Sequence, residues 1–107
     1  MKQPFSIASL PPDIGAQIRK DYPHDHEGVV REMESFIREH DYLSHERIIR
    51  CIIYIAKREK MAVASVLRSV SGDWRDAIMW AEYDDRKSLS PPQVRDFNKT
   101  FAENGIQ

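Results

Sequence analysis

The most constraining feature of the sequence is its most apolar run, Ile48 to Ala56, which reads Ile-Ile-Arg-Cys-Ile-Ile-Tyr-Ile-Ala. Projected at about 100° per residue, its apolar side chains fill roughly 200° of a helical wheel. The remaining arc carries polar and charged residues, namely Glu46, Arg47, Arg50, Tyr54, Lys57 and Arg58. A stripe this wide needs neighbours on more than one side, so the run predicts a central hydrophobic helix over about residues 45–58.

The rest of the chain favours one helical domain. Its 107 residues suffice for a single core, and 41% hydrophobic with 31% charged residues is ordinary for a globular protein. Every apolar cluster fits a period of 3.6 better than a period of 2. We therefore expect an all-α fold, a compact single-domain bundle of five or six short helices. The expected domain covers 9–101, with an N-terminal arm at 1–8 and a frayed tail at 102–107.

Two helices are expected before the central one. Pro11 and Pro12 favour a helix start, and Pro23 ends this helix near Tyr22. The second helix runs from about 24 to 40. The segment 25–41 has a local charge of −4, whereas 45–60 has a local charge of +3. We expect the second and central helices to pack antiparallel across the short link 41–44. This charge complementarity would help, but exposed ion pairs are worth only about 0–1 kcal/mol each, so burial of the facing apolar stripes must dominate.

Charged residues and residues that favour helix ends divide the second half of the chain into separate helices. A helix continued through Glu59 would place that carboxylate on the apolar stripe at a cost of several kcal/mol, so we expect a break near 58–61 and a helix over 61–71. Gly72 and Asp73 favour a stop and a new start, which gives a helix at 73–84. A capping box at 90–93 predicts a last short helix, whose apolar side is Val94, Phe97 and Phe101.

The 73–84 helix carries the strongest candidate for a functional surface. Trp74, Ala77, Ile78 and Ala81 are expected to face the core, and Met79, Trp80 and Tyr83 lie on other sides of the helix. Either the last helix covers these three, or they form an exposed patch with Arg75 and Arg86 at its polar rim. Such a patch marks an interface, and a symmetric homodimer is the first candidate.

The remaining candidate sites have simpler structural explanations. His24 and His26 could hold a metal ion and would then suggest a metal-dependent enzyme, but zinc needs further ligands and a helix start is the favoured explanation of the segment. Cys51 falls on the apolar arc and is interpreted as a core residue. No nucleophile motif or glycine-rich phosphate loop occurs. We accordingly predict no catalytic residues, no metal and no cofactor.

The basic strip of the central helix, Arg47, Arg50, Lys57 and Arg58, is the one place where the sequence could contact nucleic acid. The net charge of −1 provides no general attraction for phosphates, and a solvated face paired with the acidic second helix is the favoured explanation of the strip. The leading hypothesis is a small non-enzymatic interaction or regulatory protein that self-associates or binds a partner through residues 73–84. A nucleic-acid-associated regulator is the alternative. We expect a cytoplasmic location and no membrane segment.

Overall fold

The computed structural model describes residues 5–83 and 93–106. These residues confirm the all-α prediction, and they form five α-helices and three short 3-10 helices. The α-helices are α1 (Pro12–Asp21), α2 (His26–Glu39), α3 (Glu46–Glu59), α4 (Val63–Val70) and α5 (Trp74–Glu82). The 3-10 helices are η1 (Ile7–Ser9), η2 (Asp41–Leu43) and η3 (Ala102–Asn104). The last of these lies where the sequence predicted a frayed tail.

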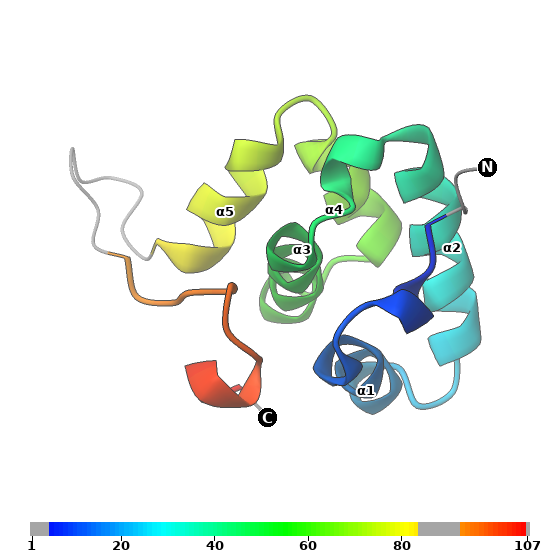
Figure 1. The fold of residues 1–107 in the computed structure, drawn as a ribbon, viewed down its shortest axis with the longest axis horizontal. Coiled ribbons are helices and arrows are strands. Elements are labelled where there is room, and N and C mark those ends of the chain that lie inside the picture. Colours follow the sequence, from blue (N-terminus) through cyan, green and yellow to red (C-terminus); the bar gives the residue numbers. More distant parts are fainter. Residues whose placement is uncertain (1–4, 84–92, 107) are drawn as a thin grey trace.

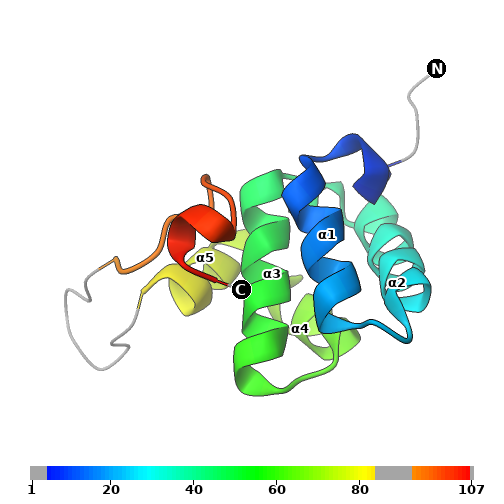
Figure 2. The ribbon, with the colours of Figure 1, turned by 90° about the horizontal axis from the view of Figure 1, so that it is seen from below.

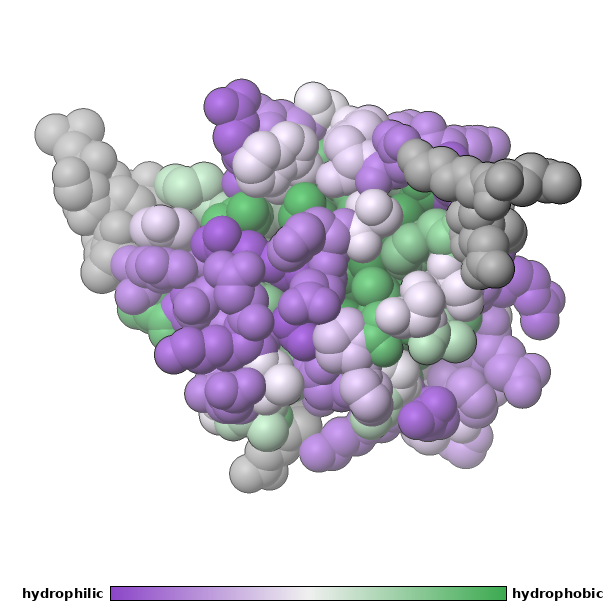
Figure 3. All heavy atoms as spheres, viewed as in Figure 1, coloured by the Kyte–Doolittle hydropathy of each residue, from purple (hydrophilic) through white to green (hydrophobic). Residues whose placement is uncertain are grey.

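Helix α3 lies at the centre of the bundle, as its wide apolar stripe predicts. Figure 1 views this helix nearly along its axis, and Figure 2 shows α1 and α2 on one side of it and α5 with the C-terminal segment on the other. It packs most extensively against α5 and also against α4 and α1. Buried along it are Ile48, Ile49, Cys51, Ile52, Ile53, Ile55 and Ala56. On the face drawn in Figure 3, green apolar residues are visible near the middle of the view, among hydrophilic residues drawn in purple.

The helix break predicted near 58–61 is confirmed, because α3 ends at Glu59. Lys60 adopts a left-handed conformation with φ of 54°, and its N–H and that of Met61 bond back to carbonyls of the last turn. This arrangement is the Schellman type of helix end, in which glycine is the usual residue. Glu59 is the last helical residue and is exposed, so its carboxylate avoids the apolar stripe.

The predicted last helix over about 93–101 is wrong. Gln93 forms an isolated antiparallel bridge with Tyr83, and the chain from Val94 to Thr100 has no helical turn. Its backbone donors bond to side chains elsewhere: the N–H of Phe97 donates to Glu82, and the N–H of Phe101 donates to Asp13. Tertiary hydrogen bonds thus replace the helical ones. The proposed cap residues 90–92 lie outside the described residues.

The predicted electrostatic pairing of the second helix with the central helix is also wrong. Helix α2 packs mainly on α1 and α4. The basic residues of α3 find their partners on other helices: Arg47 pairs with Glu82 of α5, and Arg50 and Lys57 pair with Asp13 and Asp21 of α1. Local charge totals located the oppositely charged helices but could not identify which carboxylates lie beside α3.

Candidate functional site

The outer face of α5 carries the apolar residue that the wheel placed there. Met79 is 49% exposed, one of the largest exposures among bulky apolar side chains in the described residues. Arg75 and Asp76 beside it are exposed, and Ala77 and Ala81 on the opposite side are fully buried. The helix therefore contacts the core through small residues and turns a large apolar one outward.

The two aromatic residues of this face are partly buried. The indole N–H of Trp80 donates to Glu59 at 3.3 Å, and the carbonyl of Trp80 accepts from Arg58 at 2.8 Å. Tyr83 is half-buried beside the bridge to Gln93. Trp80 thus closes over the end of α3 and leaves only part of its ring at the surface.

The segment after residue 92 reaches the carboxyl end of α5 without covering its outer face. The N–H of Val94 donates to the carbonyl of Glu82 at 2.8 Å, and the Val94 side chain is 48% exposed. Val94 therefore places a second exposed apolar side chain at the carboxyl end of α5. Trp74 differs from expectation because it lies in the first helical turn and is exposed, whereas its wheel position faces the core. We call Met79, Trp80, Tyr83 and Val94 the α5 face.

The predicted polar rim is described only in part. Arg75 pairs with Asp73, which also caps α5 by accepting the N–H of Arg75 at 3.0 Å. This hydrogen bonding lowers the pKa of the Asp73 carboxyl. Arg86 lies outside the described residues. The Arg75 side chain is 71% exposed, so this ion pair is weak and the arginine can turn to another acceptor at little cost.

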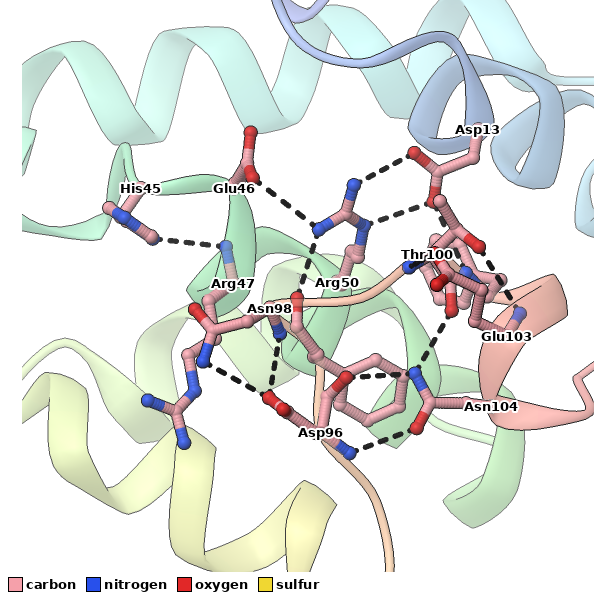
Figure 4. Close-up of polar contacts among 12 residues, drawn as sticks. Asp13, His45, Glu46, Arg47, Arg50, Asp96, Asn98, Thr100, Glu103 and Asn104 are labelled. Atoms are coloured by element: carbon pink, nitrogen blue, oxygen red, sulfur yellow. Dashed lines mark hydrogen bonds and ion pairs between the residues drawn. The ribbon is translucent and has the colours of Figure 1, made fainter.

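The basic strip of α3 does not form a continuous exposed surface. Arg50 is only 2% exposed and makes a two-pronged ion pair with Asp13, with N···O distances of 3.0 and 2.9 Å. Figure 4 shows its guanidinium enclosed between Asp13, Glu46 and the C-terminal segment, where it also donates to the carbonyl of Phe97 at 2.9 Å. Placing Arg50 on the solvated arc was therefore wrong, because a wheel cannot show that a neighbouring helix covers that arc.

A second buried ion pair involves a residue that the sequence analysis missed. Glu82 is 0% exposed and accepts two hydrogen bonds from Arg47, at 2.7 and 2.9 Å. It also accepts from the Gln93 amide at 2.8 Å and the Phe97 N–H at 3.0 Å. The hydrogen bond with Glu82 raises the pKa of Arg47. A signal existed in the sequence, since an acidic residue on the buried arc of α5 requires a cationic partner.

The two buried pairs hold the C-terminal segment against α3. The N–H of Phe97 donates to Glu82 and its carbonyl accepts from Arg50, so one residue bridges both pairs. Its ring is fully buried and packs against the rings of Tyr54 and Phe101. These contacts are structural, because every polar group in them is already occupied by another group of the same chain.

The other candidates do not assemble into a site. The described residues contain no group of three potential His, Cys, Asp or Glu metal ligands, and His24 lies in an exposed turn before α2. Cys51 is buried as predicted, and burial, together with the nearby Glu82 carboxylate, raises the pKa of its thiol well above the ordinary value. This cysteine is therefore a poor nucleophile.

Comparisons with protein-family models, with curated proteins and with solved structures find no match for this chain. In the described part of the chain, no helix has both the length and the apolar character needed to cross a bilayer.

Proposed function

We propose that this protein is a small non-enzymatic interaction protein that self-associates through the α5 face. The observation that carries the proposal is the outward position of Met79, with Val94 adding a second exposed apolar side chain at the carboxyl end of the same helix. Large apolar side chains at neighbouring surface positions gain free energy when a partner removes them from water. As part of the same proposal, the protein acts in the cytoplasm, where its single cysteine needs no disulfide partner.

The composition of the α5 face supports an interface. Met and aromatic residues are enriched at interface centres, and charged residues are enriched at the rim. Here Met79 has Trp80 and Tyr83 on its flanks, with Arg75 and Asp76 exposed on the same helix. In a two-fold arrangement each face meets its own copy, so the Arg75 of one protomer can pair with the Asp76 of the other.

The test is the mass of the full chain in solution. We expect a dimer mass by light scattering coupled to size exclusion, and a monomer mass for Met79→Glu, because a charge at the centre of the interface would be desolvated without a partner. Met79 has no part in the buried ion pairs, so circular dichroism of the variant should match that of the parent.

Ser35→Glu is the matched control, since it places the same charge at an exposed position of α2, a helix that packs mainly on α1 and α4. We expect this variant to remain a dimer. A monomer mass for the unmodified chain at the highest attainable concentration would contradict self-association, as would a Met79→Glu variant that keeps the dimer mass.

A further inference from the structure

A pocket of about 590 Å³ lies where the carboxyl ends of α1 and α3 meet. Figure 2 shows these two helices side by side and running in the same direction, so their last turns lie at the same end of the bundle. The lining residues are Lys20, Asp21, Tyr22, Ala56, Lys57, Lys60 and Met61. The volume falls within the range of small-molecule sites, about 300–1,000 Å³. None of these residues belongs to the α5 face.

One carboxylate oxygen of Asp21, a residue that lines this pocket, has no hydrogen-bond donor within the described chain. The Asp21 side chain is only 7% exposed. Its Oδ1 accepts from the Gln17 amide at 3.0 Å and lies 3.3 Å from the Lys57 ammonium. Its Oδ2 is buried and receives no hydrogen bond from any described residue. A buried carboxylate oxygen normally has a donor, so a hydroxyl or amine from outside the chain suits this position.

Three lysines line the same pocket, namely Lys20, Lys57 and Lys60. Lys20 and Lys60 are exposed, and Lys57 is close to half-exposed, so all three can turn toward a bound group. Against three positive charges stand the Asp21 carboxylate and two helix carboxyl ends, each worth about half a negative charge. The pocket remains positive by about one charge, which favours an anionic ligand.

The position of Lys60 supports this interpretation. Its left-handed φ of 54° is a conformation that glycine adopts without strain and that other residues adopt at a cost. A glycine there would end α3 equally well, but it would supply no cation. Tyr22 adds a donor, because burial and the Asp21 charge raise the pKa of its phenol and keep it protonated.

We propose that this pocket binds a small phosphate ester that also carries a hydroxyl group, as a sugar phosphate does. The phosphate lies among Lys20, Lys57 and Lys60. The Lys57 ammonium moves from Asp21 toward the phosphate, the Asp21 carboxyl turns so that Oδ2 reaches the pocket, and the ligand hydroxyl donates to Oδ2. The site is independent of the α5 face, so it can be occupied in a monomer or in a dimer.

The first experiment is a titration of the ¹⁵N-labelled full chain followed by amide chemical shifts, with glucose 6-phosphate, inorganic phosphate and glucose as separate probes. We expect saturable shifts at the amides of 20–22 and 56–61 with glucose 6-phosphate, weaker binding of inorganic phosphate, and no shifts with glucose. Absence of saturable shifts with glucose 6-phosphate at millimolar concentrations would overturn the proposal. Equal affinity for the sugar phosphate and for inorganic phosphate would also overturn it, since no hydroxyl would then be recognised.

Variants separate the two contacts. Asp21→Asn removes the acceptor charge, so glucose 6-phosphate should lose about fivefold in affinity while inorganic phosphate loses none. Lys60→Gly suits the left-handed backbone, so the fold is kept and both phosphates should bind several-fold more weakly. Lys99→Ala is the control, because Lys99 is an exposed lysine on the C-terminal segment. An unchanged affinity ratio in Asp21→Asn, or equal weakening in Lys99→Ala, would refute the site.

Discussion

Glu82 offers the sharpest test of how the C-terminal segment is held. The substitution Glu82→Gln keeps the shape of the side chain but removes its charge. The amide keeps one acceptor oxygen and presents a new N–H₂ group to donors from Arg47 and Phe97, which already point at this position. The variant therefore loses at least one charge-assisted hydrogen bond and leaves one donor opposed to another.

The expected size of the effect follows from the burial of the two partners. Breaking a buried ion pair costs about 3–5 kcal/mol when the remaining charge cannot reach water. The Arg47 side chain is 27% exposed, so water can recover part of its solvation. We therefore expect the lower end, about 3 kcal/mol. With a urea m-value of about 2 kcal/mol/M, this loss moves the unfolding midpoint down by about 1.5 M.

The assay is urea unfolding followed by circular dichroism, with equal m-values required for the comparison. Glu32→Gln is the control, because Glu32 is an exposed carboxylate of α2, and it should change the unfolding free energy by less than about 0.5 kcal/mol. A loss below about 1 kcal/mol in Glu82→Gln would refute the reasoning. Arg47→Met combined with Glu82→Gln should cost less than the two single changes together, because neither charge is then left alone.

Three further outcomes are expected. Cys51 is buried and its pKa is raised, so a thiol reagent at pH 8 should label it in the native protein only at the rate of local or global unfolding. In denaturant the labelling should be immediate. Rapid labelling of the native protein would contradict the burial of this thiol. Lys60→Gly should raise the urea midpoint, with a gain of about 1 kcal/mol in unfolding free energy, because glycine adopts the left-handed backbone conformation of this residue without strain. An unchanged or lower midpoint would contradict this expectation. The Asp96 pKa is lowered, chiefly by the hydrogen bond from the Asn98 N–H. Its contribution to the unfolding free energy is therefore complete above the ordinary carboxyl pKa of about 4 and is lost as the pH falls below that value. In Asp96→Asn, the unfolding free energy should fall less between neutral and acid pH than in the parent, as measured by urea unfolding at a series of pH values.

Much of the helical architecture follows from local pattern. The apolar period of 3.6 located the core face of α3, and the cost of burying Glu59 located the break that Lys60 makes. The same periodicity placed Met79 on the outer side of α5, where it is exposed. These features depend on residues a few positions apart, whose relative direction is set by helix geometry alone.

The C-terminal segment could not be predicted in this way. Its apolar spacing fits a helix, yet its backbone bonds to Glu82, Asp13 and Arg50, and the Asp13 contact joins residues 88 positions apart. A pattern within the segment carries no information about buried charges that distant helices present to it. Such charges bind backbone donors more strongly than neutral carbonyls do, so they outcompete the helical hydrogen bonds.

For the candidate sites, the sequence by itself determined residue chemistry and helix face, and the tertiary structure decided accessibility and partners. The wheel placed Arg47 and Arg50 together on one polar arc, whereas in the fold each is bound to a carboxylate of a different helix. The Lys20, Lys57 and Lys60 pocket exists only because α1 and α3 end side by side. Helix periodicity is a local property, but the pairing of charges depends on which surfaces the packed core brings within a few ångströms of each other.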